Sequence, residues 1–447
     1  MYSIQRLLIL TAVLCLLAGC APAPNNSNTA SVNPPATPSP SASPSPTASE
    51  TTASVQITLP LLDALLSDDK FVGQVKSNLK LTDDQISQLK HASSAEIDRL
   101  RETNAEDVDG NSSTDARTRA SDQLRTILGE DKSKQLASLV NDYWSKGDVT
   151  AGSEDKNRPQ MLAGPNAVPT DTRVVVNIPA FRMDLFQDGK LVKSYKVGIG
   201  YPEFPLPMGL RKATQIIFNP SWTPPDSPWV AKMKNVSAGE TIQPGDKDNP
   251  LGPIKIPIGL PSLIHGGKSP AKIGKFASHG CVGLTTPQIK DFAALLARAS
   301  NTDAISQKGI DSYLKDKERT QTVKLNQTVP VELRYETIVL EDGKLHIYKD
   351  VYAQDTNTEE NLRNVLAAHG VKFEDLSEQQ RTDALNALNA MSTRPTTSPS
   401  PETTPEKKSA RAKKPAPKSQ NEVVIDLSGV SSLAQKGYPA PVNLSRG

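Results

Sequence analysis

Apolar positions follow two different periods along the chain, and the period changes near residue 170. Over residues 59–146 they recur at near-helical spacing, which predicts an α-helical region. Within it, Thr82 followed three residues later by Gln85 has the spacing of a capping box, so a helix is expected to begin there. From Arg173 onward the apolar runs are short, β-branched and separated by turn residues, a pattern typical of a sheet.

The second half of the chain predicts short strands and two hairpins. Asp188-Gly189 and Asp342-Gly343 are dipeptides that favour tight hairpin turns, and each lies between two apolar runs. The expected strands cover residues 173–178, 181–186, 191–197, 214–218, 254–258, 262–265, 329–339 and 344–348. Strands of this length, separated by turns, indicate a β-rich architecture.

Few helices are expected in this half. Pro287 suits the first turn of a helix that runs to about Ala299, with Thr286 as its cap. Residues 359–391 predict one or two further helices, broken near Gly370. The fold class that follows is a mainly β domain, a β-sandwich with a short helix, preceded by a small α-helical domain.

Composition separates the folded parts from the tracts between them. Many of the 36 prolines fall within residues 33–46 and 395–417, which lack the apolar content for a core. The expected order is a signal peptide (1–19), a Pro/Ser/Thr-rich tether (20–55), a helical domain (56–150), the β domain (170–352), a helical segment (353–392), a basic Pro-rich linker (393–422) and a short C-terminal segment (423–447). The basic linker either adheres to anionic envelope polymers or is a solvated spacer.

The overall charge and the aromatic content argue against nucleic acid as a partner. The formal net charge is +2, so no strong basic excess is available to neutralise phosphates. Aromatic residues make up 4% of the chain, too few to suggest a base-stacking surface.

The N-terminus predicts export and lipid attachment. An apolar run over residues 7–18 follows Arg6 and is too short to span a bilayer, but it fits the core of a signal peptide. The run ends in Leu17-Ala18-Gly19-Cys20, which resembles a bacterial lipobox, in which the cysteine is lipidated. Cys20 is therefore the expected lipidation site, and the chain an exported envelope lipoprotein anchored to a membrane.

The cysteine count then isolates one thiol. Of the three cysteines, Cys15 would leave with the signal peptide and Cys20 would carry lipid, so Cys281 remains. A single thiol in an exported protein makes no internal disulfide. It is either buried and inert or retained for its reactivity.

Histidines gather around this cysteine. His265 and His279 lie within 17 residues of chain together with Cys281. Acyl transfer at neutral pH needs a thiolate, a base for its proton and donors for the oxyanion. Gly280 permits close backbone approach, so the amides of Gly280 and Cys281 are candidates to face the developing negative charge.

Two other interpretations of this cluster are possible. A structural cysteine with bystander histidines is disfavoured by the clustering. A zinc site is also disfavoured, because His279 and Cys281 are only two residues apart and no fourth ligand of usual spacing is in view. No metal is therefore expected.

A histidine followed about 15 residues later by Ser-His-Gly-Cys is similar to the signature of the L,D-transpeptidase (YkuD-like) family. The resemblance extends to 219–225 (Asn-Pro-Ser-Trp-Thr-Pro-Pro), to 249–253 (Asn-Pro-Leu-Gly-Pro) and to the downstream hairpin that ends in Asp350-Val351-Tyr352, so it covers about residues 173–352. The stretch Leu81-Thr82-Asp83-Asp84-Gln85 also resembles the repeat of helical periplasmic LTxxQ proteins. A polar helical hairpin that acts as a spacer or docking module remains an equal alternative for that region.

The family resemblance implies a role for each matching residue. It implies that Cys281 is the nucleophile and His265 its general base, with the Gly266 carbonyl orienting the imidazole. His279 and Gly280 complete the implied catalytic motif, and the residues implied to bind substrate are Ser278, Trp222 and Gly283. Many members carry arginine where this chain has Gly283, which puts in doubt any contact that such an arginine makes with the stem peptide.

The resemblance implies a two-step acyl transfer on peptidoglycan stem peptides, which gives 3→3 crosslinks and requires no cofactor. Hydrolysis by an L,D-carboxypeptidase and attachment of a protein to the wall share the first step. A lipoprotein that binds peptidoglycan without turnover is the alternative from another class. The expected partners are stem peptides and a membrane, with further envelope proteins contacted through the helical domain or the basic linker.

Overall fold

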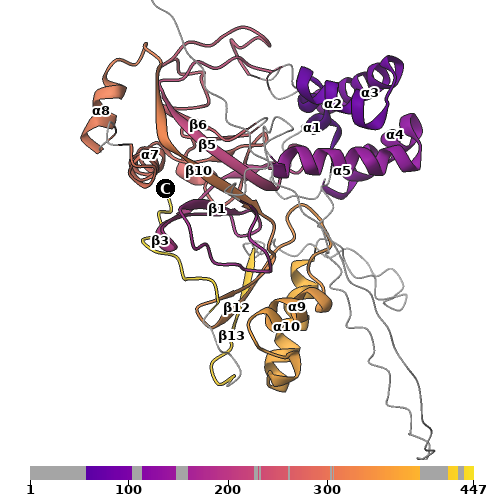
Figure 1. The fold of residues 1–447 in the computed structure, drawn as a ribbon, viewed down its shortest axis with the longest axis vertical. Coiled ribbons are helices and arrows are strands. Elements are labelled where there is room, and N and C mark those ends of the chain that lie inside the picture. Colours follow the sequence, from indigo (N-terminus) through magenta and orange to yellow (C-terminus); the bar gives the residue numbers. More distant parts are fainter. Residues whose placement is uncertain are drawn as a thin grey trace, which may run out of the picture. The chain divides into compact units, whose positions relative to one another are not determined.

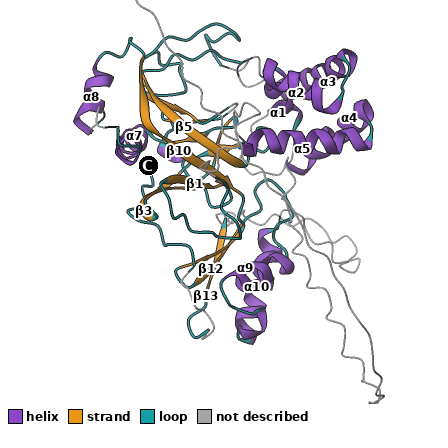
Figure 2. Cartoon of the chain, viewed as in Figure 1, coloured by secondary structure: helices purple, strands orange, loops and turns teal. Residues whose placement is uncertain are grey.

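The structure is a computed structural model that describes residues 57–102, 113–146, 160–225, 230, 233–259, 262–302, 305, 307–392, 421–430 and 437–447. Figures 1 and 2 show the elements in chain order and by type. The expected signal peptide, Cys20, the tether and the basic linker up to residue 420 lie outside the described residues. Among the described helices, none has the length and apolar character needed to cross a membrane.

The expected helical region is confirmed as five helices. They are α1 (Leu59–Leu66), α2 (Asp69–Leu79), α3 (Asp83–Glu102), α4 (Ser113–Leu128) and α5 (Glu130–Lys146). Their apolar faces share one core, in which Leu62, Phe71 and Leu136 are fully buried. The predicted capping box is present, since the Gln85 amide donates to Thr82 Oγ1 and the Thr82 amide donates to Gln85 Oε1, both at 3.2 Å.

The β domain is built on one eight-stranded sheet in the order β3-β2-β1-β10-β5-β6-β7-β9. Its strands are β1 (Arg173–Asn177), β2 (Arg182–Gln187), β3 (Lys190–Lys196), β5 (Gly209–Phe218), β6 (Ile254–Pro257), β7 (Leu263–His265), β9 (Val282–Gly283) and β10 (Gln321–Arg334). The short β4 (Ile199–Gly200) pairs in parallel with β8 (Phe276–Ser278). The expectation of a mainly β domain after a helical one is confirmed.

Two helices and a 3₁₀ turn accompany this sheet. They are η1 (Pro270–Lys272), α7 (Thr286–Ala299) and α8 (Gln307–Lys315). The apolar face of α7 is buried in the core of the sheet through Ile289, Phe292 and Leu296. This face anchors the chain directly after β9, and so fixes where β9 ends.

The expected cap of α7 was wrong by one residue. Thr285, not Thr286, caps the helix, because its hydroxyl accepts the Gln288 amide. The Gln288 side chain in turn accepts the Thr285 amide at 2.9 Å. Pro287 then lies inside the first turn, where its missing N–H removes no hydrogen bond.

The second expected hairpin is present, but it belongs to a different sheet. The run 329–339, predicted as one strand, is split between the end of β10 and β11 (Ile338–Glu341). The strand β11 pairs with β12 (Lys344–Tyr348) across the expected Asp342-Gly343 turn. A third strand, β13 (Glu422–Asp426), pairs with β12 and completes a three-stranded sheet.

Helices cover this smaller sheet. The expected break near Gly370, which has a φ of +76°, separates α9 (Glu359–Ala368) from η2 (Phe373–Asp375) and α10 (Glu378–Met391). Leu366 and Leu388 share a core with Leu345 of the sheet. The hairpin, the helices and β13 therefore form one unit with its own core.

The last residues return to the main sheet. The Ser194 amide donates to the carbonyl of Val442, and the Lys196 amide donates to the carbonyl of Ser445, so the chain end runs beside β3. Gln288 Nε2 also donates to the Ser445 carbonyl at 3.0 Å. In Figure 1 the C-terminus lies close to α7 and β3.

Candidate functional site

The pairing of β7 with β9 brings the candidate base and the candidate nucleophile together. These strands are parallel, with Ile264 opposite Val282 and His265 opposite Gly283. Continuing this register by one residue places Cys281 beside Leu263. Side chains two apart on a strand point to the same face, so Cys281 and His265 share one face of the sheet. Cys281 is the diagonal neighbour of His265 in this register, and residues so placed lie about 7–8 Å apart, which is within reach of an imidazole side chain.

His265 is fixed as a neutral imidazole. Its Nδ1 lies 2.8 Å from the carbonyl oxygen of Gly266, so Nδ1–H donates to that oxygen and the lone pair is on Nε2. Burial, together with the positive charge of Lys268, lowers the pKa of His265 to about 3. The ring is therefore an unprotonated base at neutral pH. The Gly266 contact matches the orienting role implied for that carbonyl.

The backbone of Cys281 is held by Ser278. The Cys281 amide donates to Ser278 Oγ at 3.1 Å, and the Ser278 hydroxyl donates to the Cys281 carbonyl. Burial raises the pKa of the Cys281 thiol, while a backbone contact at Leu263 and the charge of Lys268 act in the opposite direction. At neutral pH the Cys281 thiol is therefore protonated and the His265 imidazole is neutral.

This arrangement corrects one expectation about the oxyanion site. Because the Cys281 amide already donates to Ser278 Oγ, it does not point to a developing oxyanion in this state. Of the two amides expected to face the oxyanion, that of Gly280 remains a candidate donor.

Gly280 has a conformation that other residues rarely adopt. Its φ is +92°, and its carbonyl accepts a hydrogen bond from the buried Ser262 hydroxyl at 2.8 Å. A Cβ atom added to Gly200 would lie only 3.1 Å from the Gly280 nitrogen, so β4 passes close to the loop. Glycine at both positions lets the loop before Cys281 turn tightly against its neighbours.

His279 packs between two aromatic side chains. Its ring centroid lies 5.2 Å from that of Tyr201 and 4.9 Å from that of Phe204. Burial, with Lys268 and Lys272 nearby, holds the pKa of His279 well below its usual value. The structure therefore places His279 against the loop after β4, two residues before the thiol.

Trp222, expected to bind substrate, is buried in an apolar cluster. It packs with Val230 and Leu251, and Leu263 lies at the edge of the cluster. A backbone contact at Leu251 raises the pKa of His265, and a backbone contact at Leu263 lowers that of Cys281. Trp222 thus packs against the two leucines whose backbones contact His265 and Cys281.

Gly283, the third residue implied to bind substrate, lies beneath a lysine. A Cβ atom added there would lie 2.8 Å from both Cγ and Cε of Lys268. Sequence reasoning noticed the glycine and missed the lysine, which comes from the segment after β7.

Sequence reasoning also missed the function of Tyr352. Its hydroxyl donates to the Gly200 carbonyl at 2.7 Å and accepts the Leu206 amide at 3.1 Å. Since β4 pairs with β8, this tyrosine supports the strand that leads into Ser278. The Asp350-Val351-Tyr352 stretch was noticed in the sequence. Its contact with Gly200, 152 residues earlier in the chain, could not be identified from spacing.

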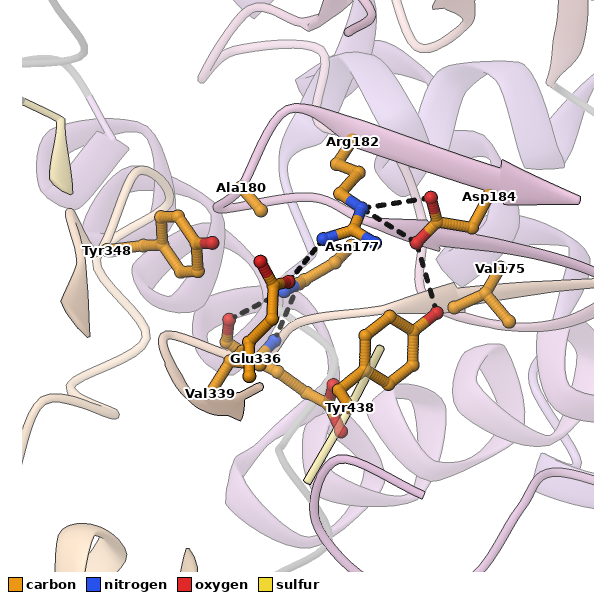
Figure 3. Close-up of a pocket in the computed structure, with 10 residues that line it drawn as sticks. Val175, Asn177, Ala180, Arg182, Asp184, Glu336, Val339, Tyr348 and Tyr438 are labelled. Carbon is orange, nitrogen blue, oxygen red and sulfur yellow. Dashed lines mark hydrogen bonds and ion pairs between the residues drawn. The ribbon is translucent and has the colours of Figure 1, made fainter. Parts of the chain in front are cut away.

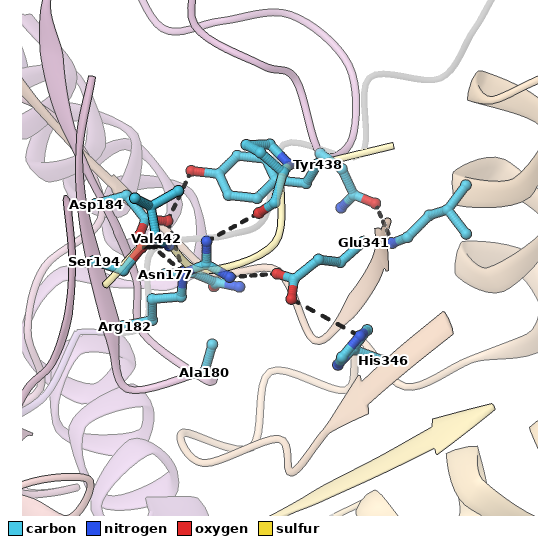
Figure 4. Close-up of polar contacts among 12 residues, drawn as sticks. Asn177, Ala180, Arg182, Asp184, Ser194, Glu341, His346, Tyr438 and Val442 are labelled. Carbon is cyan, nitrogen blue, oxygen red and sulfur yellow. Dashed lines mark hydrogen bonds and ion pairs between the residues drawn. The ribbon is translucent and has the colours of Figure 1, made fainter. Parts of the chain in front are cut away.

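A small pocket elsewhere in the protein has a different character. It is lined by Arg182 and Asp184 of the main sheet, by Glu341 of the smaller sheet and by Tyr438 of the C-terminal segment, among others (Figure 3). Arg182 Nε donates to Asp184 and a second guanidinium nitrogen donates to Glu341, while the Tyr438 hydroxyl donates to Asp184 at 3.1 Å (Figure 4). Because Arg182 pairs with a carboxylate from each sheet, this pocket is a structural contact between the two sheets.

No metal centre is indicated by the described part of the chain. Within it, no three or more His, Cys, Asp and Glu side chains gather closely enough to bind an ion. The site offers a thiol, a neutral imidazole and the Gly280 amide, the kinds of group that nucleophilic acyl transfer uses.

Comparison with known proteins agrees with this chemistry. Residues 171–321 match the family model of the L,D-transpeptidase catalytic domain (YkuD). The probable L,D-transpeptidase YbiS of Escherichia coli K12 is 33% identical over 141 residues, which are 30% of this chain and 44% of that protein. The probable L,D-transpeptidase ErfK/SrfK of the same strain is 29% identical over 134 residues, 30% of this chain and 43% of that protein. The chain thus spans less than half the length of these relatives.

Solved structures give a weaker likeness. The catalytic domain of an Enterococcus faecium L,D-transpeptidase is 15% identical, and the match covers 38% of this chain and all of that one. The TM-score is 0.25, too low to support an argument about function.

Proposed function

We propose that the chain is a peptidoglycan acyltransferase that forms 3→3 crosslinks through a thioester at Cys281, because residues 171–321 match the L,D-transpeptidase catalytic domain of the YkuD type. The observation that carries the proposal is the register of β7 and β9, which puts His265 and Cys281 on one face. The Gly266 carbonyl holds the Nδ1–H of His265, which leaves Nε2 as the ring nitrogen that accepts a proton.

The first step forms the thioester. Cys281 Sγ attacks the carbonyl carbon of the third residue of a tetrapeptide stem, and His265 Nε2 accepts the thiol proton. The Gly280 amide faces the oxyanion of the tetrahedral intermediate. As the C–N bond breaks, the imidazolium returns the proton to the leaving amine, and D-alanine departs.

The second step resolves the thioester. A side-chain amine of another stem attacks the acyl carbon, His265 removes a proton from the amine, and the C–S bond breaks. The proton returns to the sulfur, so Cys281 is again a thiol. The new amide joins the third residues of the two stems, and no cofactor enters either step.

The test is to incubate the purified full chain, and its Cys281→Ala variant, with a disaccharide-tetrapeptide and to analyse the products by mass spectrometry. Release of D-alanine with 3→3 dimers, from the intact chain alone, supports the transpeptidase. Tripeptide without dimers identifies an L,D-carboxypeptidase, and a stem joined to a protein amine identifies wall attachment. If a folded chain forms no product and no thioester, a binding lipoprotein replaces the enzyme.

We also propose that lipid on Cys20 anchors the chain to a membrane in the bacterial envelope. The support is the apolar run over residues 7–18 and the small residues directly before the cysteine. Residues 20–55 would then let the catalytic domain reach the wall. A Cys20→Ser variant should lose incorporated fatty acid and leave the membrane fraction; a variant that stays there and keeps its lipid contradicts the proposal.

A further inference from the structure

Lys268 lies across the position that Gly283 leaves empty. A Cβ atom on Gly283 would lie 2.8 Å from both Cγ and Cε of Lys268, and 3.3 Å from Cδ. The lysine backbone is fixed by its own amide, which donates to the Leu284 carbonyl at 3.0 Å. The aliphatic part of Lys268 is therefore packed on β9, and the backbone that carries its side chain is held in place.

This packing puts Lys268 on the reactive face of the sheet. Gly283 lies opposite His265 in the register and two residues after Cys281, so the space above Gly283 is on the face that both share. The positive charge of Lys268 is felt by all three titratable groups of the site, since it lowers the pKa values of His265, His279 and Cys281. Lys268 is half-buried, so water screens its charge only partly.

The proposed reaction presents a carboxylate at this place. The residue that leaves is D-alanine, whose carboxylate lies a few bonds from the carbonyl that Cys281 attacks. A buried thiol, a neutral imidazole and a neutral His279 do not attract an anion. A cation held beside them does.

We propose that Lys268 is a substrate-binding residue, whose ammonium group holds the terminal carboxylate of the donor stem beside Cys281 in the space that Gly283 provides. This inference rests on the proposed function and adds the group that selects the donor. It also gives the proposed site a cation although position 283 is not an arginine. The cation comes from the segment after β7, and a side chain at position 283 would collide with it.

The test compares two donors on the full chain. One is the tetrapeptide stem with a free terminal carboxylate, and the other is the same stem with a terminal amide. The rate of acyl-enzyme formation is followed by intact-protein mass spectrometry for the wild type, Lys268→Met and Lys268→Arg. Lys275→Met is the matched control, because Lys275 is an exposed lysine of the same segment.

We expect the wild type to favour the free acid by about tenfold or more, the worth of one charge-assisted hydrogen bond. Lys268→Met should lose that preference, mainly by slowing the acid donor. Lys268→Arg should retain most of it, and Lys275→Met should match the wild type. A Gly283→Ala variant, which displaces the lysine, should resemble Lys268→Met while Cys281 still reacts with chloroacetamide.

Three results would overturn the inference. If Lys268→Met keeps the wild-type preference for the acid, the lysine does not bind the carboxylate, although the transpeptidase proposal stands. If it slows both donors equally and shifts the pH profile of chloroacetamide alkylation, the lysine acts on the thiolate alone. If the folded wild type forms no acyl-enzyme with either donor, the proposed function fails and this inference with it.

Discussion

At the scale of single residues, the proposed site depends on backbone geometry as much as on the two side chains proposed to react. Ser278 and Ser262 hold the carbonyls of Cys281 and Gly280, and glycine at position 280 permits the turn between them. The sequence motif identified these residues as a group, because they are adjacent in the chain. It could not separate the residues that react from those that hold the backbone, since that depends on where each hydroxyl donates.

Gly280→Ala should reduce activity through the backbone alone. The added methyl group has room, with its nearest neighbours at 3.9 Å, but the φ of +92° strains any L-residue, at a cost of about 1–2 kcal/mol. Gly129→Ala is the control, because Gly129 has a φ of +78° with nothing nearby and lies after α4. Both variants should lose similar stability in urea titrations, and only Gly280→Ala should lose acyl-enzyme formation. Equal activity in the two would show that the loop before Cys281 tolerates a changed backbone.

His265 should make the protein less stable in acid. Its folded pKa is about 3, below the ordinary value of 6.5, so the unfolded chain binds more protons between these values. The stability that the neutral, buried ring contributes is therefore fully present above about pH 6.5 and is lost as the pH falls toward 3. In urea titrations at pH 7 and pH 4.5, His265→Gln should lose less stability than the wild type over that interval. An identical loss in both proteins would mean that the ring titrates normally.

At the scale of elements, strand and helix positions were well predicted from the sequence, and their partners were not. Asp188-Gly189 and Asp342-Gly343 both marked real turns. Nothing local showed that the second hairpin leaves the main sheet, because its partner β13 comes about 75 residues later, beyond the basic linker. The alternation of apolar residues sets which face of a strand is buried, but long-range pairing decides the sheet.

The strand β13 offers a direct test of that pairing. Ile425 is 7% exposed and packs in the core of the smaller sheet, whereas Val424, its neighbour on the opposite face, is 47% exposed. Ile425→Ala should lower the free energy of unfolding by about 2–4 kcal/mol, and Val424→Ala by about 0.5 kcal/mol or less. Thermal unfolding followed by circular dichroism compares them. Equal effects, or none from Ile425→Ala, would mean that β13 does not dock on β12.

At the scale of the whole molecule, the residues proposed to react lie in the β domain, but segments distant in sequence contact that domain. Residues 437–447 run beside β3 and contact α7 through Gln288. This segment had no predicted role, because its contacts are mostly through backbone groups, which leave no residue pattern. A catalytic fragment that ends at Met391 would therefore lack both β13 and residues 437–447.

The buried ion pairs between the two sheets should contribute to the free energy of unfolding as a coupled group. Arg182 contacts Asp184 and Glu341, and all three are buried (Figure 4). Arg182→Met leaves two uncompensated carboxylates, which should cost about 3–5 kcal/mol. Arg182→Met combined with Glu341→Gln should recover part of that loss, since one buried charge is removed. Additive losses, measured by urea unfolding of the four proteins of this cycle, would show that the charges do not interact.

The most direct measurement of the central claim is the intact mass of the full chain after brief exposure to a tetrapeptide stem, with peptide mapping of the adduct. The account predicts a mass gain equal to the tripeptide acyl group, located on Cys281 and removed by hydroxylamine, as a thioester is. His265→Gln should reduce its rate of formation strongly, and Cys281→Ala should abolish it. An adduct on another residue, or turnover of the stem by the Cys281→Ala variant, would contradict the assignment of Cys281 as the nucleophile.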